Sequence, residues 1–252
     1  MAAHVLPALY ALLLWWGSTG LVLLLVRLPR HSHRATLLGL ALLAATAAGT
    51  GLSDAYLAFT AGLLVWAWPE IAFLLGYVTG PNRLGCPPGT RGWRRFRLAA
   101  GTLMWHELAI VACGLLVLAA TWGAANQVGA LTFLLLWVLR LSAKLNLFLG
   151  VRNLGESFLP AHLAHLLDYL HHRRMNALLP FSLLGGGLLA VWLATHAAAA
   201  GSPVDAIGYT MVATLAALGV LEHLLMVAPL PPEMLWGERP VPPRSPAGEP
   251  PP

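Results

Sequence analysis

The chain has 252 residues, of which 58% are hydrophobic and only 10% are charged, and its formal net charge at pH 7 is +5. A soluble domain carries about 25% charged residues, so this chain has too few to cover a surface that faces water. The composition excludes a soluble globular protein, including one that binds nucleic acid. It indicates an integral membrane protein in contact with the lipid bilayer.

Seven long apolar segments follow one another along the chain. They are too long for the strands of a membrane β-barrel and lack their alternation of polar and apolar residues. Each is long enough for a helix that crosses the hydrocarbon core. The sequence therefore predicts an all-α, polytopic membrane helix bundle with seven transmembrane helices, forming a single domain over residues 1–230. The expected spans are residues 6–26, 35–52, 55–79, 98–121, 127–150, 176–196 and 206–230.

The 14 Arg and one Lys indicate the orientation of this bundle. With seven spans, every loop arginine falls at one end of the bundle, and the loops at the other end contain no Arg or Lys. Because cytoplasmic loops are enriched in these residues, we expect the N-terminus outside and the C-terminus in the cytoplasm. We also expect a cytoplasmic basic face that includes Arg83, Arg91, Arg94, Arg95, Arg97, Arg173 and Arg174.

Two segments outside the spans have a distinct pattern. Residues 156–174 are too polar to cross a membrane, but their leucines fall on one side of a helix and their histidines, with Asp168 and Tyr169, on the other. This pattern predicts an amphipathic helix that lies on the membrane surface. Residues 231–252 are rich in Pro and poor in apolar residues, so we expect a disordered cytoplasmic tail.

Local signals also mark two helix starts. Ser202 is followed by Pro203 and, three residues on, by Asp205, which predicts a helix with Ser202 as its N-cap. Asp54 is expected to cap the span that begins at residue 55. The two cysteines, Cys86 in a loop and Cys113 in the middle of a span, are not expected to form a disulfide.

Five charged side chains and two histidines lie inside the expected spans, where ionisable groups are costly and usually face the bundle interior. Counted from the cytoplasmic end of each span, they lie six to ten residues deep on four different helices. We therefore expect one polar cluster inside the bundle. With a neighbouring asparagine, its members are Glu70, His106, Glu107, Arg140, Lys144, Asn146, Glu222 and His223.

Three interpretations of this cluster are open. In the first, three carboxylates and two basic side chains form a structural ion network, with the histidines as hydrogen-bonding partners. In the second, His106 or His223 ligates the metal of a tetrapyrrole, and Arg140 or Lys144 binds a propionate. The third is a metal-dependent enzyme. It is the least favoured, because adjacent His and Glu residues on a helix point about 100° apart.

Short motifs, spread in order from the first span to about residue 236, carry a family resemblance. They are Ala58-Phe59-Thr60, Trp66-Ala67-Trp68-Pro69-Glu70, Thr79-Gly80-Pro81, Cys86-Pro87-Pro88-Gly89, Arg91-Gly92-Trp93-Arg94-Arg95-Phe96, His106-Glu107-Leu108-Ala109-Ile110, Leu139-Arg140-Leu141-Ser142-Ala143-Lys144-Leu145-Asn146, Phe148-Leu149-Gly150-Val151, Asn153-Leu154, Leu221-Glu222-His223 and Pro229-Leu230-Pro231. Together these motifs resemble the photosynthetic complex assembly protein 2 family, PuhE.

The resemblance implies a protein of the photosynthesis gene set of anoxygenic phototrophic bacteria, located in their inner (intracytoplasmic) membrane. Proteins of this family look like non-catalytic membrane factors. They help to assemble the reaction centre–light-harvesting core complex, together with other assembly factors, and the resemblance carries over no catalytic residue. The alternative is a membrane enzyme or carrier of bacteriochlorophyll metabolism, whose polar cluster transiently binds bacteriochlorophyll or a precursor.

Overall fold

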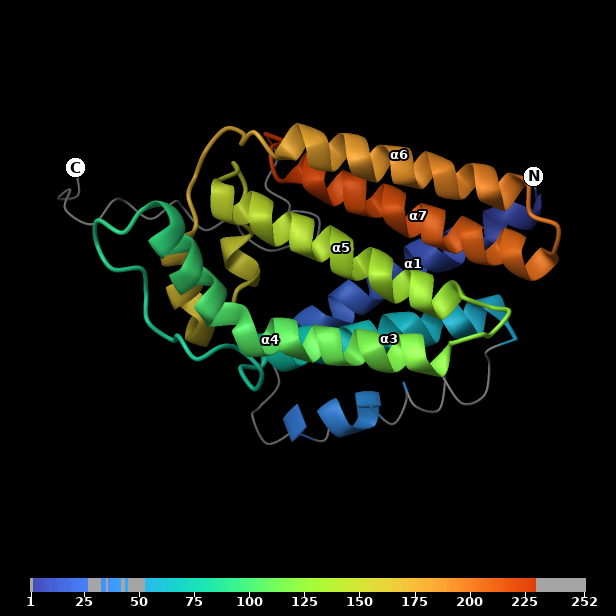
Figure 1. The fold of residues 1–252 in the computed structure, drawn as a ribbon, viewed down its shortest axis with the longest axis horizontal. Helices are drawn as coiled ribbons and strands as arrows, with labels where there is room; N and C mark the ends of the chain where they lie inside the picture. Colours follow the sequence, from blue (N-terminus) through green and yellow to red (C-terminus); the bar gives the residue numbers. More distant parts are fainter. Residues whose placement is uncertain (1, 27–32, 35, 42–43, 45–52, 230–252) are drawn as a thin grey trace.

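The structure is a computed structural model that describes residues 2–26, 33–34, 36–41, 44 and 53–229 (Figure 1). Within these residues the chain is helical, without β-strands, and six helices are long and apolar enough to cross a membrane. The protein is therefore a multi-pass membrane protein. The six helices are α1 (Ala2–Val26), α3 (Ala55–Leu74), α4 (Gly92–Ala120), α5 (Val128–Leu149), α6 (Leu179–Ala198) and α7 (Pro203–Leu225).

The remaining expected span, residues 35–52, lies mostly outside the described residues, as does the expected tail, residues 231–252. The positions described between 33 and 44 are helical. The count of seven spans and the orientation of the termini therefore stay predictions.

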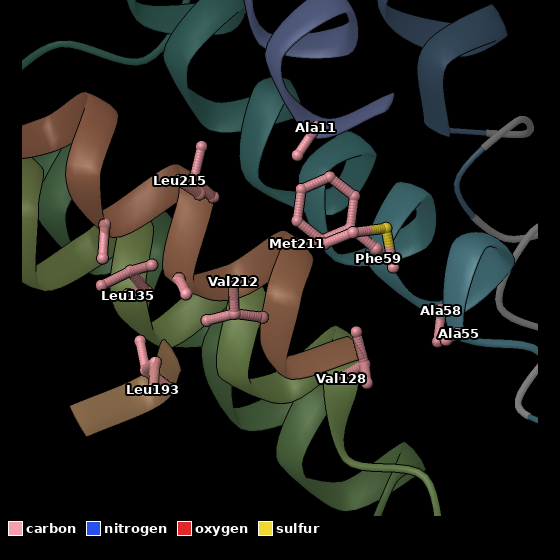
Figure 2. Packing of buried hydrophobic residues seen from close by; sticks show 12 residues of the cluster. Ala11, Ala55, Ala58, Phe59, Val128, Leu135, Leu193, Met211, Val212 and Leu215 are labelled. Carbon is pink, nitrogen blue, oxygen red and sulfur yellow. The ribbon is translucent and has the colours of Figure 1, made fainter. Parts of the chain in front are cut away.

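The helices pack around a centre formed by α3, α5 and α7, and α1, α4 and α6 lie at the periphery (Figure 1). Figure 2 shows Phe59, Met211 and Ala11 gathered where α3, α7 and α1 meet. Glycines bring α3 and α5 close together, because a Cβ on Gly62 would lie only 2.4 Å from the carbonyl oxygen of Gly129. Small residues at helix contacts are typical of membrane bundles, where close packing replaces the hydrophobic effect.

Both expected N-caps are confirmed. The carboxylate of Asp54 accepts a hydrogen bond from the backbone N–H of Leu57 at the start of α3. The hydroxyl of Ser202 accepts one from the N–H of Asp205 at the start of α7. Among the described residues both cysteines are free, as expected.

The end of α3 differs from its expected position at residue 79. The helix ends at Leu74 because Gly76 adopts a positive φ of 82°. Its N–H then bonds to the carbonyl of Phe73, and the N–H of Tyr77 bonds to that of Ala72. These two hydrogen bonds form a Schellman motif, which satisfies the last carbonyls of a helix.

The expected amphipathic helix over residues 156–174 is wrong as a continuous α-helix. The segment forms two 3₁₀ helices, η1 (Glu156–Phe158) and η2 (Ala161–Tyr169), and is extended from Leu170 onward. Tyr169, expected on the polar face, is buried with 2% of its surface exposed. Its hydroxyl hydrogen-bonds to the carbonyls of Leu84 and Gly85, so contacts with the preceding loop override the helical periodicity.

Candidate functional site

The structure brings five of the eight expected cluster residues into one chain of contacts across α3, α4 and α5, here called the charged chain: Glu70, His106, Glu107, Arg140 and Lys144. The ammonium of Lys144 lies 2.7 Å from Oε1 of Glu107 and 3.0 Å from Nε2 of His106. Nε of Arg140 lies 3.3 Å from Oε2 of Glu70. Glu70 also approaches His106 and Lys144, at 3.3 and 4.0 Å. Both basic groups thus have carboxylate partners inside the protein.

His106 is the most enclosed member of the charged chain, with none of its surface exposed. Because an ammonium can only donate a hydrogen bond, Nε2 accepts from Lys144 and the proton of the neutral imidazole is assigned to Nδ1. This N–H is buried without a hydrogen-bond partner among the described residues. The ring also packs on Phe73, with 4.6 Å between the ring centroids.

A bend in α4 positions His106. Figure 1 shows α4 turning between its first part and the part that lies along α3. At the bend, two backbone groups of α4 bond to the segment Thr79–Asn82 and not to each other's turn of the helix. The N–H of His106 donates to the carbonyl of Thr79, and the carbonyl of Gly101 accepts from the N–H of Asn82. A Cβ on Gly80 would lie 2.1 Å from the Gly101 oxygen, so only glycine permits this approach. Insertion of such a segment into a helix ladder is a recognised cause of kinks.

Glu222 on α7 lies at the outer end of the charged chain. Its Oε1 accepts a hydrogen bond of 3.1 Å from the indole Nε1 of Trp15 on α1. The guanidinium of Arg140 interacts electrostatically with Glu70, Glu222 and Glu107. Glu222 is exposed, and 42% of the Arg140 side chain is exposed. The charged chain therefore reaches the outer surface of the bundle.

His223 and Asn146 belong to a separate network of neutral groups. Nδ1 of His223 donates to the carbonyl of Gly219 at 2.7 Å, and Nε2 lies 2.9 Å from the hydroxyl of Ser142. Ser142 and the amide of Asn146 both bond to the hydroxyl of Ser182 on α6. These contacts link α5, α6 and α7. Sequence reasoning missed Ser142 and Ser182, although Ser142 lies one helical turn before Asn146 on the same face.

Among the described residues, three of the four ring nitrogens of the two cluster histidines already have polar contacts. Both ring nitrogens of His223 are hydrogen-bonded, and Nε2 of His106 faces an ammonium, which repels a metal cation. Among the described residues, no group of three or more His, Cys, Asp or Glu side chains is arranged to hold a metal ion.

Arg95 differs from the other arginines of the expected basic face. Its Nη2 donates to the carbonyls of Phe148, at 2.9 Å, and Tyr169. Its guanidinium also lies 4.2 Å from the centroid of the Phe148 ring. Arg95 therefore joins α4, α5 and η2. The other six arginines of the expected basic face are exposed: Arg83, Arg91, Arg94, Arg97, Arg173 and Arg174.

Two asparagines outside the expected cluster close helix ends nearby. The amide of Asn176 donates to the carbonyls of Asn146 and Gly150, and its oxygen accepts from the N–H groups of Leu178 and Leu179. It thus connects the end of α5 to the start of α6.

Asn153 closes another helix end. Its side-chain amide donates to the carbonyls of Leu225 and Ala228 at the end of α7.

Comparisons with known proteins place nearly the whole chain in one family. Residues 1–244 match the family described as "Protein of unknown function (DUF3623)". The chain is also similar to an uncharacterized 30.4 kDa protein in the puhA 5′ region of Rhodobacter capsulatus. The two are 38% identical over 269 residues, which cover 97% of this chain and 98% of that relative. No solved structure matches the chain. The chain therefore belongs to the DUF3623 family.

Proposed function

We propose that this protein is a non-catalytic factor for assembly of the bacterial reaction centre–light-harvesting core complex, acting in the inner membrane. The name of the R. capsulatus relative locates it in the puhA 5′ region. The motifs that resemble the PuhE family support the same photosynthetic setting. The arginine-rich end would then face the cytoplasm.

The observation that carries the non-catalytic role is the internal pairing of the charged chain. Glu107 is bonded to Lys144, and Glu70 is paired with Arg140. A catalytic or ligand-binding group needs an opening beside it, and two cavities among the described residues lie elsewhere, near α6 and the start of α7. One, of about 420 Å³, is lined mainly by alanines and valine with His4, Thr210 and Thr214. The charged chain thus supports the bundle, which presents its outer faces to partner helices.

The exposed arginines fit the same role. Six arginine side chains project from loop 75–91, from the start of α4 and from the segment after η2. Trp93, 69% exposed and stacked on Phe96, lies among them. We infer that this basic face anchors the protein at anionic headgroups and docks the peripheral parts of core subunits.

A second candidate is a carrier or enzyme of bacteriochlorophyll metabolism. The unpartnered Nδ1–H of His106 and the exposed part of Arg140 favour it, because a tetrapyrrole offers oxygen acceptors and carboxylates. The enclosure of His106 and the paired state of the carboxylates make it the weaker candidate.

The test is a phototrophic bacterium in which the chromosomal copy of this gene is deleted. We expect its membranes to lose most of the core-complex absorbance while bacteriochlorophyll is still made, and a plasmid copy to restore the complex. The protein, purified in mild detergent, should be colourless and should co-purify with core subunits. Accumulation of a bacteriochlorophyll precursor, or a stoichiometric pigment that His106→Ala removes, would establish the second candidate instead.

A further inference from the structure

Glu222, Arg140 and Trp15 form an uncovered end of the charged chain, here called the Glu222 end. Glu222 is exposed, and only one of its two carboxylate oxygens accepts a hydrogen bond from the described residues, that of Trp15. Large apolar side chains flank it: Leu221 and Leu224 are 45% and 46% exposed. The surface is therefore a charged group within an apolar helix face.

Glu222 lies three residues before the end of α7 at Leu225, but its bond to Trp15 places the carboxylate beside the middle of α1. Trp15, which bonds to Glu222, is followed on α1 by eleven further helical residues up to Val26. These residues extend about 16 Å along the helix axis at a rise of ~1.5 Å per residue. Residues 21–26 are all apolar, so α1 continues through hydrocarbon beyond the level of Glu222. An uncovered charge at such a depth is costly unless a partner group meets it.

The charges of the cluster leave one negative charge uncompensated. Three carboxylates, Glu70, Glu107 and Glu222, face two permanent cations, Arg140 and Lys144. Among the described residues, Glu70 pairs with Arg140 and Glu107 with Lys144, which leaves Glu222 without a close ion pair of its own. A partner that complements the Glu222 end must bring a positive charge.

We propose that the Glu222 end binds a transmembrane helix of a partner protein that places an Arg or Lys side chain at this depth. The proposal rests on the assembly role, because it assumes a partner embedded in the same membrane. A lipid headgroup does not fit, since headgroups lie at the interface and not beside the middle of a membrane-spanning helix. The exposed leucines beside Glu222 would pack against the partner helix, and the carboxylate would accept from its basic side chain.

The test uses synthetic single-span Leu/Ala peptides with Trp at both ends, reconstituted with the full-length protein in lipid nanodiscs. One peptide has a central Arg, one has Leu at that position, one has Glu, and one has the Arg moved two turns along the helix. Energy transfer between labelled protein and labelled peptide measures binding. We expect the central-Arg peptide to bind at least tenfold more tightly than the other three, and Glu222→Gln to remove that preference.

The outcomes separate this proposal from others. Equal binding of the Arg and Leu peptides would overturn it, as would a preference that persists in Glu222→Gln. Glu222-dependent energy transfer between two copies of the protein without peptide would assign the site to a second copy and also overturn it. If Glu222→Gln does not fold, the comparison between the central and shifted Arg peptides on the unaltered protein decides. Because this assay contains no core complex, its failure leaves the assembly role standing, and that role is tested separately in cells.

Discussion

The ammonium of Lys144 on α5 lies 2.7 Å from the carboxylate of Glu107 on α4. The same ammonium bonds to His106 and lies 4.0 Å from Glu70 on α3. One side chain therefore holds three helices together at a single point. Its removal should affect the bundle more than the removal of any other single charge in the chain of contacts.

We expect Lys144→Met to lower the free energy of unfolding by about 2–3 kcal/mol. A fully buried pair costs about 3–5 kcal/mol when one partner is removed, and Glu107, 32% exposed, keeps part of its solvation. Unfolding in mixed detergent micelles measures the change. The double variant Lys144→Met/Glu107→Leu should recover part of the loss, since it leaves no unpaired carboxylate there. If the double variant lost as much stability as the two single variants together, the two side chains would not be coupled.

We expect Gly80→Ala to destabilise the protein by about 1–3 kcal/mol or more, the usual cost of overpacking. Its new Cβ would meet the carbonyl oxygen of Gly101 at 2.1 Å, which forces the Thr79–Asn82 segment away from α4. The matched control is Gly185→Ala in α6, where nothing lies within 4 Å of the added Cβ. Thermal unfolding should separate the two variants. Equal midpoints would mean that the close approach is not needed.

We expect Arg95→Met to cost about 1–3 kcal/mol, because it leaves the carbonyls of Phe148 and Tyr169 without their charged donor. Arg94→Met, at the neighbouring exposed position, should change stability by less than about 0.5 kcal/mol. The same unfolding measurement compares them. If Arg94→Met were as damaging as Arg95→Met, the two arginines would have to share one role at the membrane surface.

We expect stability to fall as the pH drops below about 6.5. Partial burial, with the charges of Arg95 and Arg173, holds the pKa of His171 below its usual range. An unfolded histidine takes up its proton near pH 6.5, before the folded one does, so acid favours the unfolded state in this window. Unfolding between pH 7.5 and 5.5 measures the effect. His171→Gln should flatten the pH dependence, and the control His165→Gln should leave it unchanged.

The membrane character and most helix positions could be predicted because hydrophobic length is a property of the sequence alone. Helix ends were harder. The apolar residues of α3 continue past its end, and only the Schellman geometry at Gly76 stops the helix. The segment 156–174 has helical periodicity, yet the contacts of Tyr169 with the loop at Leu84 prevent a continuous helix. Both differences come from hydrogen bonds that the periodicity of apolar residues in the sequence does not reveal.

The charged residues of the site stand out in the sequence because an ionisable group in an apolar run is rare. Their partners do not, because Trp15, Ser142 and Thr79 are ordinary residues for a span or a loop. The inward direction of Arg95 also depends on the bend of α4, which arises from a segment more than ten residues earlier in the chain. Spacing along one helix cannot reveal such an arrangement.

The charged chain runs from helix to helix, across the helix axes, and therefore roughly parallel to the plane of the membrane. A charge that crosses the whole membrane gains about 2.3 kcal/mol per 100 mV, but one that moves along this direction crosses almost none of the field. Proton shifts among Glu70, His106, Lys144 and Glu107 would thus be nearly insensitive to voltage. The ion network would keep the same state whether or not the membrane is energised.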